Sequence, residues 1–119
     1  MTGKEKITRA LNHQNGPVPF DIGSLPTTGI HVSILEALRE YYGLEKRIPM
    51  IIEPFQMLGM VEDDLREAIG IGTTPLWSQG TMFGFRNENW KEWTAPWGQK
   101  VLVPGEFNTV KENGKVYIY

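Results

Sequence analysis

The sequence predicts an α/β fold over residues 1–77, followed by a small antiparallel β-meander over residues 78–119. Two observations predict this division. Helical patterns of apolar residues alternate with short extended segments up to Trp77, an alternation typical of α/β proteins. Beyond Trp77 the helical spacing stops, and glycine and asparagine separate short apolar stretches that are rich in aromatic residues.

Two amphipathic helices are predicted near the N-terminus. Thr2 and Glu5 have the spacing of a capping box, and apolar residues follow at helical intervals, so a helix is expected over about residues 3–13. A second helix, with a longer apolar stripe, is expected to be capped by Thr28 and to end at Gly43.

The middle of the chain predicts a strand, a helix and a further extended segment. The strand is the apolar, β-branched stretch 48–52, and the helix covers residues 54–69, where apolar residues again recur on one face. Residues 71–77 are then extended. The meander is expected from three short strands divided by turn residues, at 100–103, 106–110 and 115–119.

Composition excludes several classes of protein. Twelve Lys and Arg against 14 Asp and Glu leave no excess of basic residues for nucleic acid, and the absence of cysteine excludes disulfides, thiolate nucleophiles and thiolate-bound metals within this chain. No apolar run approaches the roughly 20 residues of a membrane helix. We therefore expect a cytoplasmic protein with no nucleic-acid or membrane partner. Because the sequence stops within the apolar strand 116–119, we also expect an N-terminal piece of a longer protein.

Seven short segments occur in a familiar order and spacing. They are Ala10–His13, Pro17–Asp21, Thr28–His31, Tyr41–Leu44, Glu53–Gln56, Gly70–Gly72 and Trp97–Gly98. Together they resemble the N-terminal third of the uroporphyrinogen decarboxylase (URO-D) superfamily, and most closely its divergent branch near the corrinoid-dependent methyltransferases. The resemblance implies a (β/α)8 TIM barrel, which needs about 250 residues. Residues 1–77 would supply the opening elements of that barrel, and residues 78–119 would be a β-meander insertion.

Two departures from the family pattern bear on the substrate. Residues 21–26 contain no arginine where the decarboxylases carry an arginine-rich stretch that binds substrate carboxylates. Residues 72–74 contain no carboxylate where the decarboxylases carry a catalytic aspartate. Both departures disfavour uroporphyrinogen itself.

The resemblance then implies either corrinoid-linked methyl transfer, which the missing arginines favour, or decarboxylation of another acid. Zinc, a corrinoid, a corrinoid protein and a homo-oligomeric state belong to the full-length protein in that case. This segment is expected to hold no cofactor and to be inactive alone. The alternative is a small non-enzymatic α+β binding or interaction module.

Four residues are candidates for the site. Asp21 follows a segment that resembles the first barrel strand, where a carboxylate can act as a base or orient a ligand, or else form a local turn with the backbone. His31 opens the second helix, where a neutral imidazole can bind substrate or take a proton, or else simply pack. We expect Asp21 and His31 to be catalytic. Thr73 and Thr74 stand near the place of the missing family carboxylate and are the candidates for substrate binding.

Other features have simpler interpretations. His13 closes the first helix, where its charge suits the helix dipole, and its separation from His31 is not a metal-site spacing. Trp90, Trp93 and Trp97 either stack on a flat substrate or fill a small core, and the second interpretation is favoured.

Overall fold

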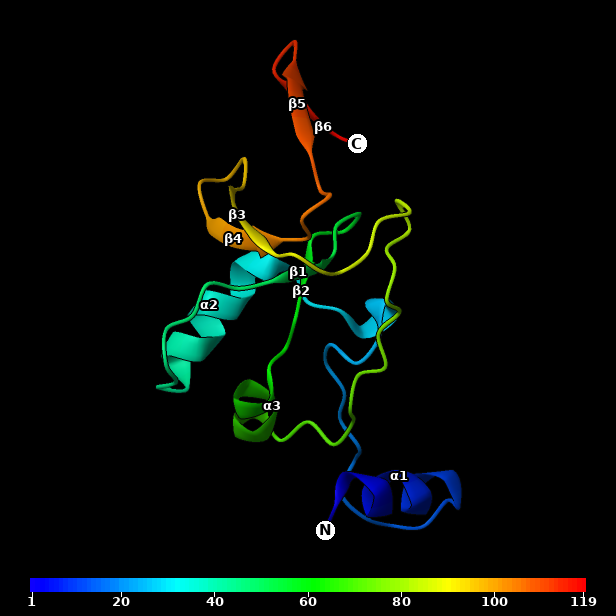
Figure 1. Ribbon diagram of the computed structural model, residues 1–119. Coiled ribbons are helices and arrows are strands. Elements are labelled where there is room, and N and C mark those ends of the chain that lie inside the picture. Colours follow the sequence, from blue (N-terminus) through cyan, green and yellow to red (C-terminus); the bar gives the residue numbers. More distant parts are fainter.

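The computed structural model describes residues 1–119 and contains three α-helices, a short 3-10 turn at Pro26–Thr28 and three two-stranded antiparallel sheets. The molecule measures 55 × 32 × 25 Å, and its radius of gyration of 16.5 Å exceeds the roughly 13–14 Å of a compact chain of this length. Figure 1 shows why: a central body carries helix α1 at one end and a β-hairpin at the other.

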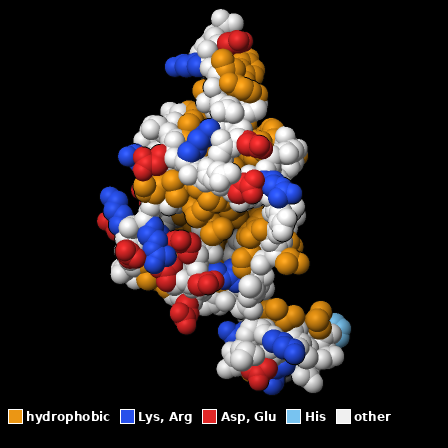
Figure 2. Space-filling model, viewed as in Figure 1, with side chains coloured by type: hydrophobic (Ala, Val, Ile, Leu, Met, Phe, Trp, Pro, Cys, Tyr) orange, Lys and Arg blue, Asp and Glu red, His pale blue; other side chains and the backbone are white.

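Helix α1 (Gly3–Leu11) begins with the capping box that the sequence predicts. The Thr2 hydroxyl accepts a hydrogen bond from the Glu5 amide at 3.2 Å, and the Glu5 carboxylate accepts one from the Thr2 amide at 2.6 Å. No residue of α1 is buried. Figure 2 accordingly shows the N-terminal part of the chain as a separate lobe below the body.

The central body combines α2 (Val32–Tyr41) and α3 (Asp63–Ile69) with two hairpins. Strand β1 (Ile51–Glu53) pairs with β2 (Leu58–Gly59), and β3 (Lys91–Thr94) pairs with β4 (Lys100–Val103). The hairpins are joined where the Leu102 amide donates to the carbonyl of Pro49 at 2.9 Å. One core spans both parts of the chain: Val32, Leu35, Ile51, Val61, Leu65, Phe85, Val101, Val103 and Phe107.

A buried arginine ties α2 to the start of α3. The Arg39 side chain is 5% exposed, and its two terminal nitrogens donate to the two carboxylate oxygens of Asp64 at 2.8 and 2.7 Å. Its Nη1 also reaches Glu62 at 3.2 Å, and its Nε donates to the carbonyl of Glu45 at 2.8 Å. The hydrogen bonds from Arg39 outweigh desolvation and lower the pKa of Asp64 to about 2.

The last hairpin projects from the body. Strands β5 (Thr109–Glu112) and β6 (Lys115–Ile118) are joined by Asn113 and Gly114, which have φ values of 50° and 75°. Two successive positive φ angles are what a tight hairpin turn needs. The hairpin forms the far end of the molecule in Figure 1.

The expected opening of a (β/α)8 barrel is wrong, because the structure has only antiparallel two-stranded sheets. The expected helix 54–69 begins only at Asp63, and a turn over residues 54–57 returns the chain so that β2 pairs with β1 instead. The extended segment 71–77 forms no ladder. It makes one backbone hydrogen bond to the extended segment that precedes Asp21, from the Gly72 amide to the carbonyl of Phe20 at 3.2 Å.

Further boundaries differ from the expectation. His31, not Thr28, caps the second helix, because Thr28 lies in the 3-10 turn and the chain is extended between them. The expected single meander is also wrong: β3–β4 and β5–β6 are separate sheets.

None of the helices combines the length and the apolar character that crossing a bilayer needs.

Candidate functional site

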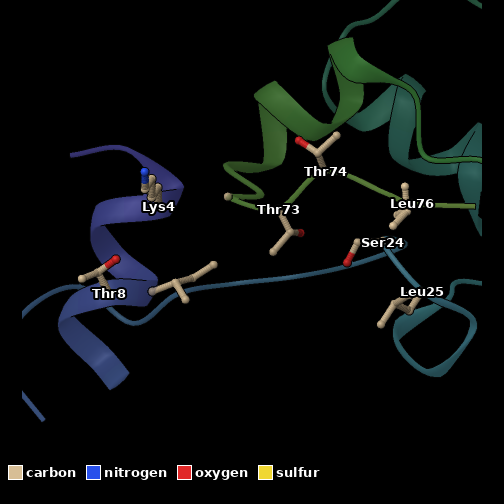
Figure 3. A pocket seen from close by; sticks show the side chains of 9 residues that line it. Lys4, Thr8, Ser24, Leu25, Thr73, Thr74 and Leu76 are labelled. Atoms are coloured by element: carbon tan, nitrogen blue, oxygen red, sulfur yellow. The ribbon is translucent and has the colours of Figure 1, made fainter. Parts of the chain in front are cut away.

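A pocket of about 500 Å³ lies where α1 meets two loops of the body (Figure 3). In Figure 3, Lys4 and Thr8 project from α1 on one side, with Thr73 and Ser24 across the pocket. The full lining is Lys4, Ile7, Thr8, Ser24, Leu25, Gly72, Thr73, Thr74 and Leu76. Both predicted substrate-binding residues therefore line this pocket.

Two glycines bring α1 to this place. A Cβ on Gly3 would overlap the carbonyl of Gly72, and a Cβ on Gly72 would lie 2.8 Å from Cα of Gly3. Only glycine at both positions allows so close an approach. Gly70, which ends α3 with a φ of 86°, turns the chain toward this contact. The residues that follow, Thr73 and Thr74, are thereby placed at the edge of α1.

Asp21 lies beside the pocket and is hydrogen-bonded to it. The Thr73 hydroxyl donates to the Asp21 carboxylate, and the loop after Asp21 is closed by a hydrogen bond from the Gly23 amide to the carbonyl of Thr28 at 2.8 Å. Burial raises the pKa of Asp21, but hydrogen bonds from Ser24, Thr73 and Thr28 offset this and leave that pKa below its ordinary value. Asp21 is thus an ionised acceptor at neutral pH, suited to holding Thr73 in place.

His31 has a different set of partners. Its Nδ1 accepts the Ser33 amide at 3.2 Å as the cap of α2, so the ring proton sits on Nε2. The ring packs on Trp97 with centroids 5.0 Å apart. No hydrogen bond joins His31 to Asp21, and His31 is not part of the lining of the pocket. The structure therefore does not bring the two predicted catalytic residues together as a hydrogen-bonded pair, and their catalytic roles stay predictions.

The electrostatic character of the pocket comes from one cation among hydroxyls. Lys4 is the only charged side chain in the lining, and Thr8, Ser24, Thr73 and Thr74 supply hydroxyl groups. Such a set can bind one anionic group and further oxygen atoms. Sequence reasoning missed Lys4, Thr8 and Ser24. The available signal was the i, i+4 spacing of Lys4 and Thr8, which places both on one face of a helix.

Neither a metal centre nor an aromatic platform forms. No group of three or more His, Asp or Glu side chains is placed to hold a metal ion. Trp93 packs edge-on against Phe107 in the core at 5.0 Å, while Trp97 packs on His31. The three tryptophans therefore do not stack on one another.

Comparison with protein-family models, with curated proteins and with solved structures finds no match to this chain.

Proposed function

We propose that this chain is the ligand-binding N-terminal part of a cytoplasmic enzyme related to the URO-D family, and that its pocket binds the carboxylate of a small acid. The observation that carries the proposal is that one ammonium group, that of Lys4, lines the same pocket as the hydroxyls of Ser24, Thr73 and Thr74. A Lys ammonium forms short, charge-assisted hydrogen bonds with a carboxylate, and the Thr74 hydroxyl can donate to a second oxygen, because the hydroxyls of Thr73 and Ser24 donate to Asp21.

Charge and size both favour a small substrate. One positive charge matches one carboxylate, whereas uroporphyrinogen carries many. The volume of about 500 Å³ lies within the range of roughly 300–1,000 Å³ that is usual for small-molecule sites. The missing arginine-rich stretch agrees with this choice, since residues 21–26 supply only neutral groups and the carboxylate of Asp21.

For the full-length enzyme we propose methyl transfer involving a corrinoid protein, with decarboxylation of a small acid as the second candidate reaction. The side chains of this chain do not fit a resident zinc ion. There is no cysteine, and the two histidines lie at the ends of different helices: His13 follows the end of α1, and His31 caps the start of α2. What these residues do is bind and orient: Lys4 holds the carboxylate, and Asp21 fixes the rotamer of Thr73.

A second candidate function, a non-enzymatic binding module, is favoured by one observation. The carboxylate beside the pocket, that of Asp21, has a lowered pKa, so it is not tuned for proton transfer near neutral pH. Turnover separates the two candidates. An enzyme converts the bound acid, and a binding module releases it unchanged.

The binding proposal is tested by calorimetric titration with propionate and lactate, using methyl propionate as the uncharged control. Lys4→Gln should weaken acid binding about tenfold or more, since a hydrogen bond to a charged group contributes roughly 1.5–3 kcal/mol. Thr74→Val removes a hydroxyl of the lining and should weaken acid binding as well. The matched control is Lys111→Gln, which removes an exposed charge on β5 and should leave binding unchanged. Binding of the ester as tightly as the acid, or no effect of Lys4→Gln, would refute the proposal.

A further inference from the structure

A second cavity, of about 520 Å³, lies between the turn that joins β1 to β2 and the loop that follows Trp77. Phe55, Leu76 and Met82 line it, and each is largely exposed, at 65, 87 and 70%. Leu76 also lines the acid pocket, so the two cavities adjoin. The second cavity contains no cation. Its charged lining residue is Glu53, whose carboxylate accepts the amides of Phe55 and Gln56 at 3.1 and 2.7 Å.

Two residues of this lining carry buried polar atoms without a partner. They are Nε1 of Trp77, a hydrogen-bond donor, and Oδ1 of Asn87, an acceptor. Buried polar atoms in native proteins are nearly always paired, so two orphans of opposite kind on residues that line one cavity need an explanation. A partner that offers both an acceptor and a donor would satisfy them together.

The orientation of the Asn87 amide follows from its other contacts. Its Nδ2 donates to the carbonyl of Ile52 at 3.3 Å, and its backbone amide donates to the carbonyl of Gln79 at 3.0 Å. Exchanging the amide nitrogen and oxygen would set two oxygens against each other at Ile52. Oδ1 is therefore the atom left over, and it is an acceptor.

The loop around these atoms has little regular structure. Between Trp77 and Asn87 the chain has no helix or strand and contains one isolated bridge, between Gly80 and Arg86. Phe85 anchors the loop in the core, while Met82 and Phe83 at its tip are exposed. Because both atoms are buried, the proposed ligand reaches them only if the loop shifts, with Phe85 remaining in the core.

We propose that this second cavity binds a neutral, flat ring that carries a hydrogen-bond donor next to an acceptor, as in a cyclic amide or a nitrogen heterocycle. The acceptor of the ring pairs with Nε1 of Trp77, and its donor pairs with Oδ1 of Asn87. The aromatic side chains of Phe55 and Trp77 supply faces on which a flat ring stacks. The carboxylate of Glu53 disfavours an anion, which distinguishes this site from the acid pocket beside it.

The test compares two ligands on the unaltered protein. 2-Pyridone has an N–H donor next to its carbonyl acceptor, and N-methyl-2-pyridone lacks only the donor. Titration is followed by the indole N–H resonance of Trp77 in a ¹H–¹⁵N NMR spectrum, assigned with Trp77→Phe. We expect 2-pyridone to shift this resonance and to bind at least tenfold more tightly than its N-methyl derivative.

Three outcomes would overturn the proposal. Equal binding of the two compounds would show that Oδ1 of Asn87 accepts nothing, and a shift at another indole alone would place the ligand elsewhere. No binding of either compound would mean that ordered water alone pairs with the two atoms. Trp90→Phe, which removes an indole outside the cavity lining, is the matched control and should leave the affinity unchanged. Because neither compound is an acid, their failure would leave the acid-binding proposal standing.

Discussion

The contact between Arg39 and Asp64 should make the stability of this protein depend on pH below 4. In the folded chain the pKa of Asp64 is lowered from 3.8 to about 2, chiefly by the two hydrogen bonds from the buried guanidinium of Arg39. A carboxyl group whose pKa is lower in the folded state stabilises that state wherever it is ionised in both states. This contribution is fully present above pH 3.8 and is lost as the pH falls from 3.8 toward 2.

The magnitude follows from the same values. At 1.36 kcal/mol per pKa unit, the gap between 3.8 and about 2 corresponds to about 2 kcal/mol. The Asp64 side chain is 31% exposed, so solvent screening reduces the contribution, and we expect about 1 kcal/mol. Asp64→Asn removes the titrating group and should remove this part of the pH dependence.

Urea denaturation at a series of pH values between 2 and 6 measures the effect. The free energy of unfolding of the unaltered protein should fall about 1 kcal/mol further over this range than that of Asp64→Asn. Asp63→Asn is the matched control, because the Asp63 side chain is fully exposed and 3.7 Å from its nearest cationic partner. Parallel curves for the unaltered protein and Asp64→Asn would refute the assignment of this stabilisation to the contact with Arg39.

Two further predictions concern α1 and the cap of α2. Gly72→Ala should weaken acid binding at least tenfold, because its Cβ would lie 2.8 Å from Cα of Gly3, and it should leave the unfolding midpoint of the body unchanged. Gly80→Ala is the control: its Cβ would have its nearest neighbour at 3.9 Å, so both acid binding and the unfolding midpoint should stay unchanged. If Gly72→Ala bound propionate normally in calorimetry, α1 would not form part of the site. His31→Ala should lower the stability measured by thermal unfolding by about 1 kcal/mol, the usual cost of losing a helix cap, and His31→Asn should restore most of it. Equal melting temperatures for His31→Ala and the unaltered protein would contradict the capping role.

Local signals in the sequence predicted local structure well. The capping box of Thr2 and Glu5 is present, and Gly43 and Gly70 follow their helices with positive φ. The turn at Asn113 and Gly114 also forms where its residues indicate. Each of these features depends on residues within about four positions of one another, which is why composition and spacing are sufficient to predict it.

The errors arose where distant residues decide the structure. Residues 54–62 have apolar side chains at helical spacing, yet they form a turn and strand β2. The Glu53 carboxylate, which binds the amides of Phe55 and Gln56, is a local signal for the turn that the helical pattern concealed, whereas the pairing of β2 is not local. Leu58 then pairs with Glu53 and forms an isolated bridge to His31. No pattern within that stretch reveals a partner at His31. The barrel expectation, which depended on the resemblance, is wrong because all three ladders are antiparallel and parallel pairing is limited to the isolated bridge between Met50 and Leu102.

The residues of the candidate site also fall into two groups, those that the sequence indicated and those that only the fold brings in. Thr73 and Thr74 were found from their place in a motif, whereas Lys4 and Thr8 join them only through the contact of Gly3 with Gly72, nearly seventy positions along the chain. A lysine on the polar face of a helix looks like an ordinary solvated residue until the facing segment is known. Asp21 was found for its position, but its three hydroxyl partners make it an ionised acceptor, and that property follows from the fold.

Acid binding and the position of α1 should be linked by mass action. Helix α1 buries none of its residues, and its approach to the body passes through Gly3 and Gly72. An anion held between Lys4 on α1 and Thr74 on the body adds contacts across that junction. A ligand that binds only the docked arrangement stabilises it by RT ln(1 + [L]/Kd), so saturating acid should protect α1 from proteolysis or hydrogen exchange. The same linkage explains why Gly72→Ala, which removes no group that touches the acid, should still weaken its binding.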